Sequence, residues 1–215
     1  EGLGVPAERI TSIPVGCSED LFFPTPLPLA TSAVVLYYCS YQPLHGVDVV
    51  LQAAAQLQNE SLRFRLIGKG PLREAMELLA SSLGLRNVDF LDDVPPAIIA
   101  RELQAATICL GGHFGASAKA QRTIPGKVYQ MLAAARPAIC ADSPANRELL
   151  VNGESALLVP AGDAAVLAEA IRILDNNCAL LETIAQGGRL AYEQNASEAV
   201  IGAQLRSVIT SLTSR

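Results

Sequence analysis

Tryptophan is absent from this 215-residue chain, which holds only two methionines and two histidines, His45 and His113. The five cysteines are widely spaced and include no C-x-x-C pair. A structural zinc site needs closely spaced cysteine or histidine ligands, so a zinc module is excluded. The cysteines are best interpreted as small buried hydrophobic residues of a reducing compartment, which predicts a cytoplasmic protein.

An excess of positive charge is also lacking, since 16 basic residues face 21 acidic ones and the net charge is −5. Nonspecific nucleic-acid binding needs a basic surface, and we predict no nucleic-acid partner. The longest strand-like apolar run covers residues 33–38. A membrane span needs roughly 20 apolar residues, so we predict no transmembrane segment. A hydrophobic content of 50% with 17% charged residues excludes intrinsic disorder.

Short apolar runs alternate with helical patterns along most of the chain, and no hairpin turn separates them. This order predicts parallel strands joined by right-handed crossovers. Because the strands are apolar throughout, both faces of the sheet should be covered by helices. The fold class is therefore α/β, a doubly wound, Rossmann-like parallel sheet. The expected strands cover residues 33–39, 62–68, 88–91, 106–111, 137–141 and 155–160.

Composition suggests three segments. Residues 1–30 are rich in proline and predict an interdomain linker that packs on the domain, with one short strand at residues 10–14. Residues 31–176 form the Rossmann-like domain, and residues 177–215 form C-terminal helices. A short helix is expected in residues 143–150, and another in residues 125–135. The first residue is Glu rather than Met, and we expect a larger parent protein.

Ligands of open parallel sheets bind beyond the carboxyl ends of the strands. One loop there is Gly68–Pro71, with the sequence GKGP. Glycines allow a backbone to approach a ligand closely, although an ordinary tight turn explains the same pattern. The loop lacks the third glycine and the downstream acid of a dinucleotide fingerprint, and the chain has no Walker A motif.

The loop of residues 112–126 holds Lys119 and Arg122 and leads into a helix that carries Lys127 in its first turn. Free amides at a helix N-terminus together with a lysine form a suitable site for phosphate. A solvated basic loop is the alternative. His45 either donates to a phosphate or caps its helix, and His113 follows the fourth strand without an evident carboxylate partner. We assign no catalytic residue, and the loops hold no carboxylate pair for a metal.

Several longer motifs carry a family resemblance. The N-terminal segment reads LGVPAERITSIPVGCSEDLFFP, and later segments read KVYQMLAAARPAICAD and ELLVNGESALLVPAGDAAVLAEAI. Their order and spacing resemble the C-terminal, donor-binding domain of retaining glycosyltransferases with the GT-B fold. The resemblance is to glycosyltransferase family 4, also called group 1, and it covers essentially the whole chain. It implies one half of a GT-B architecture.

The resemblance implies transfer of a sugar from a UDP- or GDP-linked donor with retention of configuration, as in polysaccharide biosynthesis. It implies no metal and no further cofactor. Base and ribose should contact Gly68, Lys69, Gly70 and Val94. The diphosphate should lie near Pro125, Gly126 and Lys127.

Three positions depart from the family pattern. Gln130 stands where the family has a ribose-binding glutamate, and Arg122 stands where it has a glutamate near the donor sugar. Glutamine can still bond a ribose hydroxyl, whereas arginine has no acceptor atom. His45 lies near the place of a family lysine. The segment KAQRTIPGKVYQ is similar to a subgroup that reads KAxRVIPNKVYQ, which favours an alternative donor site.

The resemblance also implies a missing N-terminal domain that binds the acceptor. We therefore expect little transferase activity from this domain alone, and peripheral contact with the inner membrane face through the missing domain. Two alternatives stay open: a non-catalytic nucleotide-sugar-binding module, and a GT-B relative such as a UDP-sugar 2-epimerase.

Overall fold

A single six-stranded parallel sheet organises the chain in the computed structural model, which describes residues 4, 6, 9–28 and 32–213. The strand order is β3-β2-β1-β4-β5-β6. The predicted doubly wound α/β fold is confirmed. The strands are β1 (Ala33–Tyr38), β2 (Leu62–Ile67), β3 (Val88–Leu91), β4 (Ile108–Gly112), β5 (Ala138–Ala141) and β6 (Leu157–Val159).

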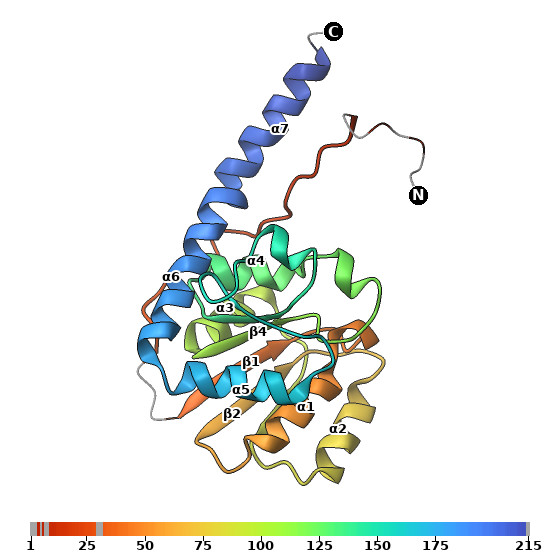
Figure 1. Cartoon of the computed structure of the whole chain (residues 1–215), viewed down its shortest axis with the longest axis vertical. Helices are drawn as coiled ribbons and strands as arrows, with labels where there is room; N and C mark the ends of the chain where they lie inside the picture. The colour runs from red at the N-terminus through yellow and green to blue at the C-terminus, as the bar shows by residue number, and fades with distance from the viewer. Residues whose placement is uncertain (1–3, 5, 7–8, 29–31, 214–215) are drawn as a thin grey trace.

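Helices cover both faces of the sheet (Figure 1). One face packs on α1 (Val47–Gln56), α2 (Arg73–Ser82) and α5 (Ala164–Asp175), and the other packs on α3 (Pro96–Ala105) and α4 (Gly126–Ala133). The helix α6 (Cys178–Asn195) contributes to the core on both sides. The last helix is α7 (Glu198–Thr213). Short 3-10 turns are η2 (Pro43–His45), η3 (Ala120–Arg122) and η4 (Asn146–Glu148). The apolar strands therefore bury side chains on both sides, as expected for central parallel strands.

Two local predictions were wrong. Residues 10–14 form no strand, because they lie along the surface without pairing to the sheet. The expected helix in residues 143–150 is reduced to the 3-10 turn η4. Ser143 Oγ does accept from the Asn146 amide at 3.1 Å, as an N-cap would. The turn stops there because Leu150 is needed in the core, where it is 2% exposed.

The N-terminal segment is tied to the base of the domain. Phe22 lies in the core beneath α4, and the fully buried Arg136 donates from Nη2 to the carbonyl oxygens of Thr25 at 2.7 Å and Pro26 at 3.1 Å. Glu19 accepts the Glu198 amide at 3.0 Å, and Glu198 accepts the Glu19 amide at 3.2 Å. This reciprocal pair fixes the start of α7 to the segment.

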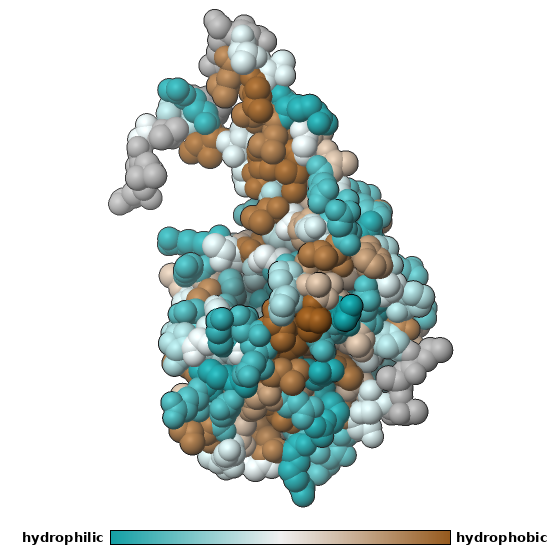
Figure 2. All heavy atoms as spheres, turned by 180° about the vertical axis from the view of Figure 1, so that it is seen from behind, coloured by the Kyte–Doolittle hydropathy of each residue, from teal (hydrophilic) through white to brown (hydrophobic). Residues whose placement is uncertain are grey.

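α7 projects beyond the body of the domain (Figure 1), and none of its residues is buried. An apolar stripe runs along it (Figure 2), and its exposed members are Leu205, Ile209 and Leu212. Within the part of the chain that the structure describes, no helix is both long and apolar enough to span a membrane.

The direction of strand addition reverses between β1 and β4, which are neighbours in the sheet. Parallel α/β sheets open a crevice at such a switch point, beyond the carboxyl ends of the two strands. The fold thus places a candidate ligand site at Tyr38, at Gly112 and at the start of α4.

Candidate donor site

Lys127 lies at the switch point, in the first turn of α4. Its ammonium nitrogen lies 4.2 Å from the centroid of the Tyr37 ring and 5.6 Å from that of the Tyr38 ring. The nitrogen is buried and has no hydrogen-bond partner among the described residues. Burial lowers the pKa of Lys127 to about 8. Since burial of an unpaired cation is costly, the site favours an anion that would pair with it.

Two histidines stand beside this lysine, and their ring centroids are 5.4 Å apart. His45 Nδ1 accepts the Gln42 amide at 3.1 Å, so the neutral ring carries its proton on Nε2. The Tyr37 hydroxyl donates to the His45 carbonyl at 2.6 Å and holds this turn in place. His113 Nδ1 is buried without a partner in the described structure.

Both imidazoles are electrically neutral at physiological pH. Burial, and then the charge of Lys127, lower the pKa of His45 to about 3 and that of His113 to about 4. Lys119 adds to the effect on His113. The histidines therefore offer neutral hydrogen-bonding groups, and Lys127 supplies the positive charge.

The GKGP loop packs against the backbone that follows β1. Gly68 has φ 133° and Gly70 has φ 155°. A Cβ atom would lie 2.0 Å from the Cys39 carbonyl oxygen at Gly68, and 1.8 Å from that of Ser40 at Gly70. Both positions need glycine because two loops of the protein cross closely there.

A pocket of about 230 Å³ lies beside this crossing. Two facing walls come from the loops after β2 and β3, and the end of β1 with the residues that follow it forms a third side. Lys69 and Asp93 face each other across it, with the ammonium 2.8 Å from a carboxylate oxygen. The lining residues are Tyr38, Cys39, Ser40, Ile67, Gly68, Lys69, Asp93, Val94 and Ile99.

Gln130 adjoins this pocket through Tyr38. The Tyr38 hydroxyl donates to Gln130 Oε1 at 2.7 Å, which leaves the amide nitrogen of Gln130 for a ligand. Sequence reasoning missed Tyr37 and Tyr38, which connect α4 to the pocket. A pair of tyrosines at the carboxyl end of a central strand is the signal that could have identified them.

The structure gathers most of the predicted site residues. Gly68, Lys69 and Val94 line the pocket, and Gly70 abuts Ser40 beside it. Gln130 bonds Tyr38, which lines the pocket. Lys127 contacts the rings of Tyr37 and Tyr38 and lies close to His45. Pro125 is buried immediately before α4, and Gly126 is exposed at its first position.

Arg122 is the exception. It is exposed and lines a different hollow of about 480 Å³, with Tyr129 and Glu148 among its neighbours. That hollow lies between the N-terminal segment, α4 and α7, and the other predicted site residues do not line it. Tyr129 points from α4 toward it, whereas Lys127 and Gln130 contact the tyrosines of β1.

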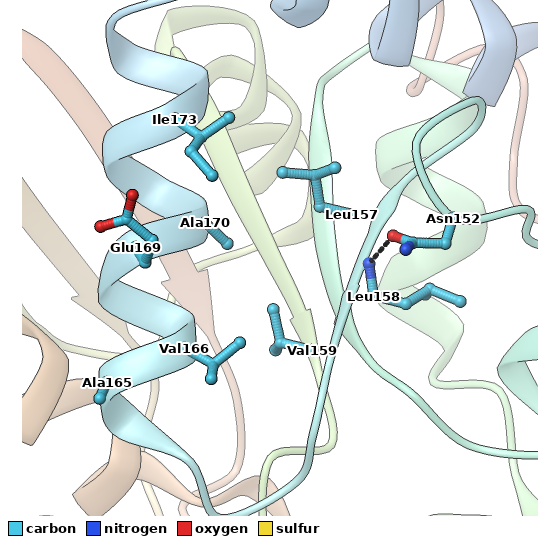
Figure 3. Close-up of a pocket in the computed structure, with 9 residues that line it drawn as sticks. All are labelled: Asn152, Leu157, Leu158, Val159, Ala165, Val166, Glu169, Ala170 and Ile173. Carbon is cyan, nitrogen blue, oxygen red and sulfur yellow. Dashed lines mark hydrogen bonds between the residues drawn. The ribbon is translucent and has the colours of Figure 1, made fainter.

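A further groove of about 430 Å³ lies between β6 and α5, at the edge of the sheet (Figure 3). Leu157, Val166 and Ile173 line it, and Glu169 is its one charged side chain. Asn152 Oδ1 accepts the Leu158 amide at 2.8 Å at its border. With no cation in its lining, this groove does not suit a phosphate group.

Metal-ligating side chains are not clustered in the described ranges: no group of three or more His, Cys, Asp or Glu residues there could hold a metal ion.

The arrangement is thus a doubly wound α/β domain of GT-B type with a basic centre at its switch point. The sequence model of the family described as glycosyl transferases group 1 matches residues 32–177. The chain belongs to this family, and the family resemblance seen in the sequence is confirmed.

Curated relatives support the assignment. The chain is 28% identical over 221 residues to an exopolysaccharide phosphotransferase of Streptomyces coelicolor, covering 100% of this chain and 22% of that protein. It is 28% identical over 163 residues to a phosphatidyl-myo-inositol mannosyltransferase of Mycobacterium leprae, and this match covers 74% of this chain and 42% of that protein. The chain therefore spans less than half the length of these two relatives.

Solved structures share the fold. Anabaena HepE in complex with UDP has a TM-score of 0.84 at 20% identity, and the match covers 97% of this chain and 59% of that chain. The C-terminal domain of a group 1 glycosyl transferase family protein from Francisella tularensis has a TM-score of 0.66 at 16% identity, and the match covers 83% of this chain and 97% of that chain.

Proposed function

We propose that this chain binds the nucleotide-sugar donor of a retaining glycosyltransferase. The observation that carries the proposal is the buried, unpaired ammonium of Lys127 at the switch point of the sheet. A diphosphate would bring the negative charge that this position lacks. Family membership and the UDP complexes of HepE support a nucleotide-sugar, with UDP as the first candidate.

We assign each part of the donor to a different part of the site. The first-turn amides of α4 and the Nε2–H of His45 would join Lys127 at the diphosphate. The 230 Å³ pocket would take the nucleoside, with the Gln130 amide at the ribose. During transfer, the bond from the anomeric carbon to the diphosphate oxygen breaks and a bond to the acceptor oxygen forms on the same face, while the acceptor hydroxyl gives its proton to the leaving diphosphate. Lys127 would stabilise the negative charge that develops on the leaving diphosphate.

We further propose that a separate N-terminal half binds the acceptor. These relatives are about two to five times as long as their matched regions, which leaves room for such a half. The exposed stripe of α7 gives it an apolar surface to pack on. On this proposal the isolated chain binds the donor in the cytoplasm but transfers little sugar, and membrane contact comes through the other half.

The test is a calorimetric titration of the 215-residue chain with UDP, GDP and ADP and with the matching nucleosides. We expect a diphosphate to bind more tightly than its nucleoside, because only the diphosphate reaches Lys127. Comparison of the three bases identifies the nucleotide. Equal affinity for every nucleoside and its diphosphate would contradict the phosphate site.

A non-catalytic binding module is a second candidate. It is favoured by the position of Arg122, which faces another hollow, and by the neutral Gln130 in place of a carboxylate. Addition of the N-terminal half of the parent protein separates the two. An enzyme would then release nucleoside diphosphate from its donor in the presence of acceptor, whereas a module would bind the donor and leave it intact.

A further inference from the structure

Arg73, the first residue of α2, joins two loops of the candidate site. Its Nη1 donates to the Gly68 carbonyl at 2.6 Å and to the Leu91 carbonyl at 2.8 Å. The side chain is 17% exposed, so these bonds lie largely out of water. No pattern in the sequence distinguishes this arginine, because it lies in an ordinary amphipathic helix.

The two carbonyls mark the ends of β2 and β3. Backbone pairing of these strands runs to Ile67 and Leu91, followed by a last bond from the Gly68 amide to the Leu91 carbonyl at 3.1 Å. Beyond this point the chains separate into the two walls of the 230 Å³ pocket. Arg73 thus extends the β2–β3 connection by one step, with a side chain in place of a backbone bond.

The guanidinium of Arg73 is itself held on several sides. Its Nε lies 2.5 Å from Glu77 Oε1, and its central carbon lies 5.3 Å from the Tyr41 ring centroid and 5.1 Å from that of Phe90. A planar group fixed between two rings and a carboxylate loses little freedom when it bonds the carbonyls. Arg73 therefore forms a rigid link between the Gly68 and Leu91 carbonyls.

The second link between the same walls is weaker. Lys69 and Asp93 pair at the mouth of the pocket, where their side chains are 80% and 54% exposed. Exposed pairs of this kind contribute little and are screened by salt. Beyond the last backbone bond of the β2–β3 pair, Arg73 is therefore the stronger of the two side-chain links between the walls.

We propose that Arg73 is a positioning residue for the nucleoside: by bridging the Gly68 and Leu91 carbonyls, it sets the distance between the walls that hold the base and ribose. The inference rests on the proposed function of the pocket. Arg73 would touch neither the nucleoside nor the diphosphate. Its removal should therefore weaken ligands that fill the pocket and spare a ligand that needs only the basic centre at Lys127.

The experiment compares Arg73→Gln and Arg73→Lys with a matched control, Arg65→Gln. Arg65 is also a partly buried arginine in an ion pair, with Nη1 3.0 Å from Glu102 Oε2, but it lies in β2 away from the pocket. Uridine, UDP and inorganic pyrophosphate are titrated into each folded variant. Thermal unfolding of each variant shows that the titrations are made well below its midpoint.

For Arg73→Gln we expect uridine and UDP to bind about tenfold more weakly, with pyrophosphate affinity within about twofold of wild type. For Arg73→Lys the loss of uridine and UDP affinity should be smaller, since an ammonium can still donate to the two carbonyls but lacks the planar guanidinium that is held by Glu77 and the two rings. Arg65→Gln should leave all three affinities unchanged. A loss of nucleoside affinity without a loss of pyrophosphate affinity is a result that general destabilisation of the fold would not produce.

Two results would overturn the inference. One is wild-type affinity for uridine in Arg73→Gln, and the other is an equal loss for uridine and pyrophosphate. If Arg73→Gln does not fold, the same comparison in Arg73→Lys decides. If the wild-type chain binds neither uridine nor UDP, the proposed function is wrong as well. If the wild-type chain binds both and the Arg73 variants bind them equally well, only the positioning role of Arg73 is wrong.

Discussion

Lys127 shows how one residue can cost stability and still be useful. Its ammonium is buried against Tyr37, and the described structure offers it no hydrogen bond. The ring face gives partial compensation through a cation–π contact. An unpaired buried charge nevertheless opposes folding, and such costs are typical of functional sites.

Replacement of this lysine by methionine should separate the effect of Lys127 on stability from its effect on donor binding. Lys127→Met keeps most of the side-chain volume and removes the buried charge, so we expect the free energy of unfolding to rise by about 1–2 kcal/mol. UDP should bind about 10- to 100-fold more weakly, with uridine little changed. Chemical denaturation and calorimetry measure the two quantities. A variant that loses both stability and uridine binding would show that Lys127 is structural.

The pH dependence of donor binding should follow the same amine. The folded-state pKa of Lys127 is lowered by burial from 10.5 to about 8. The ammonium is thus present below that value and lost above it, so UDP affinity should fall about tenfold between about pH 7 and about pH 9. Because the unfolded chain keeps its proton longer, the stability cost of Lys127 is full below about pH 8 and is relieved as pH rises from there toward 10.5. The affinity profile of Lys127→Met should be flat over this range.

Gln130 should behave differently from Lys127. Its Oε1 already accepts from the Tyr38 hydroxyl, and only its amide nitrogen is left to meet a neutral ribose. Gln130→Ala should weaken UDP and uridine by similar factors, each equivalent to about 0.5–1.5 kcal/mol. Salt should have little effect, whereas the contribution of Lys127 should shrink at high salt. Tyr38→Phe, which frees the Gln130 side chain, should give a smaller loss of the same kind.

At the scale of elements, α7 stands apart from the rest of the chain. The other helices bury at least one residue each, whereas α7 buries none and exposes 46% of Leu205 and 67% of Leu212. Its first turn is nevertheless tied to Glu19. An apolar face held in a defined position but left uncovered is typical of a docking surface.

Polar substitutions on α7 should therefore be tolerated by this chain alone. Leu205→Gln with Leu212→Gln should change the free energy of unfolding by less than about 0.5 kcal/mol each. The matched control is Ile184→Gln in α6, a fully buried position, which should cost several times more, about 3 kcal/mol or above. A large loss from the α7 pair would mean that the stripe packs on the domain itself.

At the scale of the whole molecule, the charge distribution favours a metal-independent site. The chain carries a net charge of −5, yet Lys127 and the start of α4 place positive potential at the switch point. Protein groups can thus supply the countercharge to a diphosphate.

Chelation should accordingly leave donor binding intact. We expect UDP affinity in excess EDTA to match that in magnesium within about twofold, because the countercharge comes from α4 and Lys127. Titrations in the two buffers provide the measurement. A loss of about tenfold or more on chelation, equivalent to ~1.4 kcal/mol, would reveal a metal site.

Much of the fold was predictable, because it depends on local patterns. The predicted β3 ends coincide with the observed strand, and α4 lies within the helix expected in residues 125–135. Errors fell where no periodic pattern existed, at residues 10–14 and at η4. At η4 the proline and the cap mark where a helix can start, but tertiary packing decided how far it ran.

The candidate site likewise has features that the sequence could predict and features that depend on tertiary packing. The sequence by itself determined the α/β class, the basic residues of the loop before α4, and the glycines after β2, since each follows from residue type and spacing. Only the tertiary structure decided that Lys127 lies on Tyr37, that Gln130 bonds Tyr38 across 92 residues of chain, and that Arg122 faces elsewhere. These contacts depend on the order of strands in the sheet, which sets which loops meet at the switch point and which no local pattern encodes.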